Sequence, residues 1–307
     1  MVEIRGLIHQ VGLIHRVGLG RLAVLAAVIL QALGKIAFGT WLTDVSSPAF
    51  VFVSFSLTAL VFLIRSSSGQ GERDWLALLG LNLATALTFL CFFFALKLIE
   101  PAIVGAIEIG VGPMLALLIA FVVAGQKPAL VQVIVSLGIG LGCVFLGLSA
   151  LSGEGYALSG THAWIGLVAS VLAGIGAVLI TILSKRLIGR GWSFGAVLAH
   201  RFYVIIPLSL ILALVDGDPF GAITLELWGI ILGVSVVGVL LPLYLLQVGV
   251  GRCDPYTLMV TMSALPVVTF LLEGLSPVYS WTWLTASGLV VVMLFIGLDI
   301  LSNRESA

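Results

Sequence analysis

Charged residues are scarce in this sequence: only 9% of the 307 residues are Asp, Glu, Lys or Arg, whereas 61% are hydrophobic. A soluble domain carries about a quarter charged residues, so this composition excludes an ordinary soluble globular protein. Apolar blocks of about 20 residues recur along the chain, each long enough to cross about 30 Å of hydrocarbon as a helix. A β-barrel would instead show alternating segments of about ten residues. The sequence therefore predicts an all-α membrane protein.

Cysteines and catalytic motifs are also sparse. The three cysteines, Cys91, Cys143 and Cys253, are far apart and form no CxxC pair, so we expect neither a disulfide nor a metal site. The formal net charge is zero, which leaves no basic face for nucleic acid. The sequence has no Walker loop GxxxxGK[ST] and no nucleophile paired with a histidine and an acid. We therefore expect no enzyme, no cofactor and no metal.

The apolar blocks predict ten transmembrane helices joined by short connections. The expected helices cover residues 21–42, 47–64, 75–98, 101–123, 128–150, 162–188, 193–215, 227–249, 255–274 and 281–300. The chain then divides into a cytosolic N-terminal arm (1–20), a first five-helix repeat (21–150), an outer connecting loop (151–161), a second five-helix repeat (162–300) and a cytosolic tail (301–307).

The distribution of basic residues predicts the orientation, because cytoplasmic loops carry most Lys and Arg. With the N-terminus inside, the outer segments hold only Lys97, and Lys35 and Arg201 fall within spans. All other basic residues lie in inner segments: Arg5, Arg16, Arg21, Arg65, Arg73, Lys127, Lys185, Arg186, Arg190, Arg252 and Arg304. We therefore expect an even number of spans, with both termini on the cytoplasmic side of a bacterial-type inner membrane.

Two parts of the chain share a proline pattern. Glu100-Pro101 is followed by Pro113, and Asp254-Pro255 is followed by Pro266 at nearly the same spacing. A five-helix repeat has an odd number of spans, so its second copy enters the membrane from the opposite side. Inverted repeats of this kind are the architecture of many alternating-access transporters, with the substrate bound near the midplane between the copies.

The stretch "NLATALTFLCFFFALKLIEPAIVGAIEIGVGP", residues 82–113, resembles the third and fourth helices of the ten-helix EamA-type members of the drug/metabolite transporter superfamily. The resemblance rests on Asn82, the aromatic run from Phe89 to Phe94, Pro101 and Pro113. Among the branches, the chain looks most like the YddG-type exporters of aromatic amino acids. It implies two inverted five-helix repeats around a central substrate cavity.

Four ionisable residues lie well inside the predicted spans, away from the span ends: Lys35, Glu108, His200 and Arg201. Such residues are costly in a bilayer and usually face a cavity or a partner. From the rise of about 1.5 Å per residue, Lys35 and Glu108 both lie roughly 20 Å from the inner surface. Three interpretations stay open: a buried ion pair that only fixes helix packing, an ion pair within a substrate cavity, or a Glu108 that titrates a proton without a partner.

A second polar layer is expected closer to the inner surface. His200 and Arg201 lie there with Asn82, and Tyr203 follows on the same helix. The predicted substrate-binding residues are therefore Lys35, Asn82, Glu108, His200, Arg201, Tyr203 and Tyr244. Three prolines within spans are expected to kink their helices: Pro113, Pro207 and Pro266.

The polar residues and the resemblance favour a secondary transporter that exports small amphiphilic metabolites, most of all aromatic amino acids. Lys35 or Arg201 would attract a carboxylate, and Glu108 an ammonium group or a proton. The alternative is proton-coupled efflux of cationic drugs through Glu108, which a neighbouring Lys35 disfavours because it repels cations. The expected partners are a small-molecule substrate and membrane lipid, for a monomer or weak homo-oligomer.

Overall fold

The computed structural model describes residues 2–65, 71–72, 74–125, 127–152, 160–215, 217, 220, 223–274 and 282–305; for residues 2–17 and a few helix ends only the backbone is described. Within these ranges the regular structure is entirely helical. Most of the predicted connecting loop 151–161, and Trp281, lie outside them.

The helices reproduce the expected spans. In order they are α1 (Val2–Trp41), α2 (Ser47–Arg65), α3 (Trp75–Ala95), α4 (Pro101–Ala124), α5 (Leu130–Ser152), α6 (Gly160–Gly189), α7 (Phe194–His200), α8 (Ile205–Val215), α9 (Leu225–Val234), the π-helical η1 (Ser235–Leu240), α10 (Leu241–Arg252), α11 (Pro255–Met262), α12 (Leu265–Glu273) and α13 (Trp283–Glu305). In the described chain, nine apolar stretches are long enough to cross a membrane, and Trp283–Asp299 is a shorter tenth. The predicted ten-helix membrane fold is confirmed.

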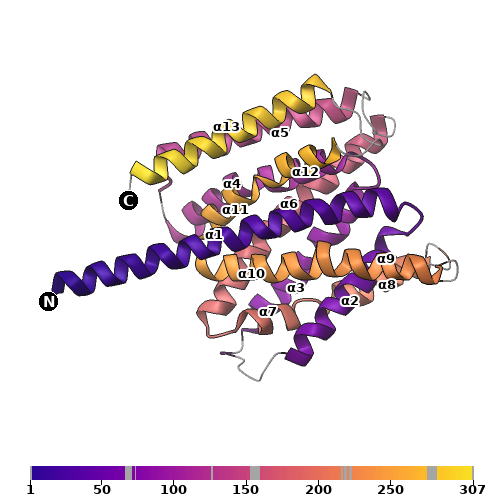
Figure 1. Ribbon diagram of the computed structural model, residues 1–307, viewed down its shortest axis with the longest axis horizontal. Coiled ribbons are helices and arrows are strands. Elements are labelled where there is room, and N and C mark those ends of the chain that lie inside the picture. The colour runs from indigo at the N-terminus through magenta and orange to yellow at the C-terminus, as the bar shows by residue number, and fades with distance from the viewer. Residues whose placement is uncertain are drawn as a thin grey trace.

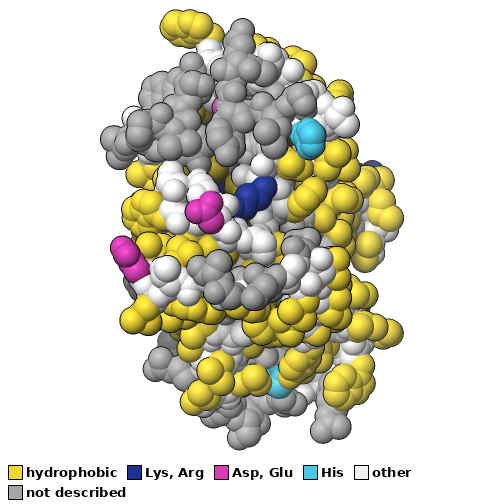
Figure 2. Space-filling model, turned by 90° about the vertical axis from the view of Figure 1, so that its right-hand side faces the viewer, with side chains coloured by type: hydrophobic (Ala, Val, Ile, Leu, Met, Phe, Trp, Pro, Cys, Tyr) yellow, Lys and Arg dark blue, Asp and Glu magenta, His cyan; other side chains and the backbone are white. Residues whose placement is uncertain are grey.

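The two ends of the molecule are distinct. Both termini lie at one end, called here the terminal end, and α1 and α2 meet at the opposite, distal end (Figure 1). Termini on one side are what an even number of spans requires. Seen from the distal end, hydrophobic side chains cover much of the flanks and few charged ones are visible (Figure 2). Large apolar side chains such as Leu22 and Ile29 are exposed on the flanks, as lipid contact demands.

The helices of the first half pack mainly on those of the second. α3 lies along α6, α1 along α10, and α4 against α6 and α12, while α5 and α13 form a pair at one edge (Figure 1). The two predicted repeats therefore interlock.

α1 differs from the expectation at its start. The helix begins at Val2 instead of near residue 21, so the predicted N-terminal arm is helical and continuous with the first span. Residues 2–20 contain no proline, and nothing else in them forces the helix to end.

Two spans are broken, and each break lies just before a proline. Residues 201–204 separate α7 from α8, three residues before Pro207, and residues 263–264 separate α11 from α12, before Pro266. A proline removes one backbone donor and its ring clashes with the carbonyl four residues earlier, which explains these positions. Pro113, in contrast, lies inside the continuous helix α4.

α1 crosses η1 with no side chain between the two backbones. A Cβ on Gly34 would overlap with the Cα of Gly238, and the reverse holds for a Cβ on Gly238. Glycine at both positions is therefore required for this close approach. The crossing fixes the height of the next residue, Lys35, in the bundle.

At the terminal end, Asp74 ties α3 to α6. Its side chain accepts a hydrogen bond of 3.1 Å from the Ala77 amide, which caps α3. The same carboxylate lies 2.7 Å from Arg186 and 3.0 Å from Arg190, near the end of α6. The Ala77 amide, and then the two guanidinium groups, hold the pKa of Asp74 below its ordinary value.

We expect Asp74→Asn to lower the Tm at pH 7 by on the order of 2 °C, because asparagine keeps the cap but loses both ion pairs with half-exposed arginines. A depressed carboxylate pKa stabilises the fold above the unfolded-state value of about 3.9 and stops doing so as the pH falls through the folded-state value. The difference in Tm between Asp74→Asn and the natural protein should therefore shrink below about pH 4. Asp74→Ala, which also removes the cap, should lower the Tm further. Thermal unfolding between pH 3 and 8 checks this; a difference that does not change with pH would contradict it.

Candidate functional site

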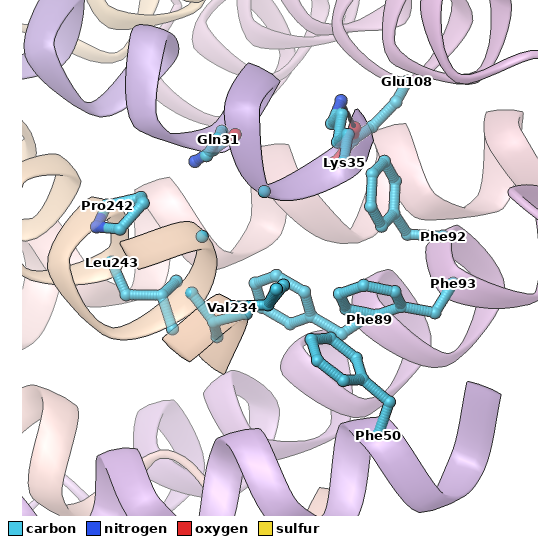
Figure 3. Close-up of a pocket in the computed structure, with 13 residues that line it drawn as sticks. Gln31, Lys35, Phe50, Phe89, Phe92, Phe93, Glu108, Val234, Pro242 and Leu243 are labelled. Carbon is cyan, nitrogen blue, oxygen red and sulfur yellow. Dashed lines mark ion pairs between the residues drawn. The ribbon is translucent and has the colours of Figure 1, made fainter. Parts of the chain in front are cut away.

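The centre of the bundle is hollow. Two adjoining cavities share Gln31, Phe89, Glu108 and Leu243 and are together called the chamber. The first cavity, drawn in Figure 3, is lined by Gln31, Gly34, Lys35, Phe50, Phe89, Phe92, Phe93, Glu108, Val234, Gly238, Val239, Pro242 and Leu243. The second, closer to the terminal end, is lined by Gln31, Thr88, Phe89, Glu108, Ala177, Ile180, Thr181, Arg201, Leu243, Leu246, Gln247, Val250, Leu258, Met259 and Met262.

Lys35 and Glu108 lie next to each other on one side of the first cavity (Figure 3). Lys35 Nζ lies 3.7 Å from Glu108 Oε2, and both side chains are nearly buried. The ammonium also lies 4.5 Å from the centre of the Phe92 ring, a cation–π distance. At 3.7 Å the pair is wider than a hydrogen bond, and Nζ has no hydrogen-bond partner among the described residues. The pair is therefore loose, and it borders open space.

Arg201 lines the second cavity, at the end of α7 where the helix breaks. Its side chain is 3% exposed, and the guanidinium carbon lies 5.4 Å from the Phe202 ring and 6.0 Å from the Phe89 ring. Nε has no hydrogen-bond partner within the described chain. A buried cation without a carboxylate is costly, and aromatic faces offset only part of that cost. The chamber thus contains an unneutralised positive charge.

Asn82 has a different position from the predicted one. Its amide nitrogen donates to the carbonyls of Leu78 and His200, both at 2.9 Å, and its oxygen accepts from the Tyr203 amide at 2.8 Å. It thereby satisfies backbone groups that the break after α7 leaves without partners. Asn82 holds the broken span in place and does not line either cavity.

Three other predicted binding residues also lie outside the chamber lining. His200 Nδ1 and the Tyr203 hydroxyl form a hydrogen bond with each other, and Tyr203 is 53% exposed. Tyr244 is 42% exposed and stacks on Phe62, with ring centres 5.8 Å apart. Tyr203 lies in the break between α7 and α8, and Tyr244 lies on the outer side of α10, whose chamber side carries Leu243 and Gln247 instead.

The structure adds polar residues that the sequence reasoning did not select. Gln31 lies in both cavities, and Gln247 in the second is 1% exposed with an amide nitrogen that lacks a partner among the described residues. Both glutamines are polar residues within apolar helices, and this contrast in the sequence could have identified them as candidate lining residues. A further carboxylate, Glu273, is 3% exposed at the end of α12.

Residues 18–148 match the EamA-like transporter family. No curated protein matches the chain. A crystal structure of another protein matches with a TM-score of 0.69 and 18% sequence identity, over 94% of this chain and 99% of that one, and shows that the fold is shared. The part of the chain that supplies Lys35 and Glu108 is therefore similar to the EamA-like transporter family.

Proposed function

We propose that this protein is a secondary transporter that exports small zwitterionic metabolites, foremost aromatic amino acids, by alternating access through the chamber. The observation that carries the proposal is the charge of the chamber lining. Lys35 and Glu108 balance each other, whereas Arg201 has no carboxylate partner among the described residues. A substrate with one carboxylate would neutralise the chamber.

The arrangement suits both charged groups of an amino acid. Arg201 presents donors that fit a carboxylate in two parallel hydrogen bonds. Glu108, loosely held by Lys35 and shared by both cavities, is available to an ammonium group. An ammonium that reached Glu108 would compete with Lys35, so binding would rearrange the pair without leaving a buried charge alone.

Aromatic rings favour an aromatic or otherwise apolar substrate body. Phe50, Phe89, Phe92 and Phe93 all line the first cavity (Figure 3). Aromatic pairs contribute about 0.5–1.5 kcal/mol beyond the burial of their area, so rings in this wall would select a ring in the substrate.

A cationic drug fits this chamber less well. Such a substrate could pair with Glu108, but it would leave Arg201 without an anion and bring a third positive charge near Lys35. The proposed membrane is a bacterial-type inner membrane with the terminal end in the cytoplasm, supported by the concentration of Lys and Arg in the segments at that end.

Counterflow in liposomes tests the proposal. Purified protein would be reconstituted with unlabelled phenylalanine inside, and uptake of labelled phenylalanine, tyrosine, tryptophan, leucine and the cation tetraphenylphosphonium would be compared. We expect counterflow of the aromatic amino acids and none of the cation. Uptake of tetraphenylphosphonium with no amino-acid counterflow would establish the drug-efflux alternative.

A further inference from the structure

Glu273 connects the two halves of the molecule at the distal end. It is the last residue of α12, and its Oε1 accepts a hydrogen bond of 2.8 Å from the backbone amide of Ala102. Ala102 is the second residue of α4, a position whose N–H has no acceptor within its own helix. The carboxylate therefore caps α4, where the helix dipole also favours a negative charge. An ionised Glu273 holds the end of α12 to the start of α4.

Lys35 lies between this carboxylate and Glu108. A Cβ on Gly105 would lie 2.8 Å from Lys35 Nζ, so the ammonium rests against α4 at that residue. Gly105 is three residues from Ala102 and three from Glu108, a rise of about 4.5 Å in each direction. Nζ is hydrogen-bonded to neither carboxylate in the part of the chain that the structure describes. A single lysine thus stands midway along one helix face between two buried carboxylates.

Several charged groups surround Glu273. The titratable groups that face it are Lys35 from α1 and Glu100, the buried N-cap residue of α4; Glu108, whose side chain is 12% exposed, faces Lys35 from the other side. Like charges at short range disfavour ionisation of the group with the weaker partners. A proton that enters this region would therefore go to the carboxylate that Lys35 pairs with less closely.

The opposite end lacks a corresponding carboxylate. Aligning Pro113 with Pro266 places Ala120 opposite Glu273, and aligning Pro101 with Pro255 places Tyr256 opposite Ala102. Ala120 and Tyr256 both line a cavity near the terminal end. There α11 is capped from within its own segment, because the Asp254 carboxylate accepts a hydrogen bond of 2.9 Å from the Thr257 amide. The carboxylate contact therefore exists in one copy of the repeat only, and the repeat fold does not require it.

We propose that Glu273 is a proton-sensitive latch that holds the distal end of the chamber closed, and that Lys35 couples it to Glu108. Ionised Glu273 binds the α4 N-terminus, and a proton on its carboxylate weakens that hydrogen bond and lets α12 and α4 separate. Lys35 favours the ionised form of whichever carboxylate it approaches, so the proton goes to the other. The coupling to substrate rests on the proposed function, because only a cationic group at Glu108 would displace Lys35; the latch itself does not.

Hydrogen exchange at the Ala102 amide tests the latch directly and needs no substrate. Exchange would be followed by mass spectrometry from pH 5.5 to 8.5 and divided by the intrinsic rate at each pH. We expect protection of this amide to fall about tenfold on acidification, because a hydrogen bond to a charged acceptor is stronger by about 1.4 kcal/mol than one to a neutral acceptor. In Glu273→Gln, which keeps an acceptor oxygen, protection should not vary with pH. In Glu273→Ala it should be absent at every pH.

Asp44→Asn is the matched control, since Asp44 is an exposed carboxylate at the same end of the molecule. It should behave like the natural protein. Protection that is independent of pH in the natural protein, or equally pH-dependent in Glu273→Gln, would overturn the proposal. Absence of amino-acid counterflow would refute the proposed function and leave this exchange result standing, so the two failures are distinguishable.

Opening of the distal end can be measured separately. Spin labels at Thr43→Cys and Leu271→Cys, both exposed, would report the distance between the turn after α1 and α12 in a variant whose three natural cysteines are alanine. We expect longer distances at pH 5.5 than at pH 8.5, and no such change when Glu273→Gln is added. Identical distance distributions at the two pH values would show that Glu273 does not hold the distal end closed.

Discussion

Lys35→Met is expected to destabilise the protein at pH 8 by about 3–5 kcal/mol, the cost of leaving one member of a buried ion pair alone. Glu108 is 12% exposed and pairs with Lys35, so after the substitution its charge has no cation beside it. Unfolding monitored by circular dichroism in detergent measures the loss. The loss should shrink at pH 5, where the abandoned carboxylate can take a proton.

The double variant Lys35→Met/Glu108→Gln is the control for this prediction. Replacing both members removes the uncompensated charge, so most of the lost stability should return although two residues now differ from the natural ones. If the double variant is less stable than Lys35→Met alone, the two side chains do not interact as the 3.7 Å distance indicates.

Arg201→Leu is expected to raise the KM for phenylalanine by about 30-fold or more, corresponding to a loss of 2 kcal/mol or more for a buried charge-assisted pair. Arg201 is 3% exposed on the wall of the second cavity. Among the described residues that line this cavity it is the positively charged one, so a substrate carboxylate would pair with it. Counterflow of labelled phenylalanine at graded concentrations measures the change.

A decarboxylated substrate separates recognition from misfolding. Phenethylamine has no carboxylate, so Arg201→Leu should bind it at least as well as the natural protein does. Arg201→Lys keeps the positive charge but not the planar guanidinium. Its KM for phenylalanine should therefore lie between those of the natural protein and Arg201→Leu. Equal losses for phenylalanine and phenethylamine would mean that Arg201 supports the fold and does not read the carboxylate.

Much of the fold could be predicted from the sequence because the bilayer imposes helix lengths. The ten apolar blocks and their order required only counting. The depth of a residue in the membrane could also be predicted. The rise per residue gives Lys35 and Glu108 the same height, and the structure brings their side chains together.

Rotation about each helix axis could not be predicted in the same way. Tyr203 and Tyr244 have suitable depths, but they point away from the chamber, since packing with neighbours sets which face is inward. The break after α7 was placed at Pro207, whereas it lies at residues 201–204, in the turn that the proline ring disturbs. That shift makes Asn82 a support for the break.

Glu273 was not among the predicted site residues, for a related reason. A glutamate followed by glycine at the end of an apolar block reads as a solvated helix terminus, because both residues are common where a helix meets water. Only the three-dimensional structure brings the start of α4 to this carboxylate and buries the contact. Contacts between helices far apart in sequence carry no local signature.

The glycine crossing of α1 and η1 has a mechanical consequence. Where Gly34 meets Gly238 the two backbones touch directly, so they cannot come closer and have no side chains that must change rotamer when they turn. This contact can therefore act as a pivot. When one half of the molecule rocks against the other, groups far from the contact move most and groups next to it move least. The backbone of Lys35 is next to this contact and would move little during such rocking. Its long side chain could then turn from one carboxylate to the other by changing rotamer, while the helices that carry Glu108 and Glu273 move.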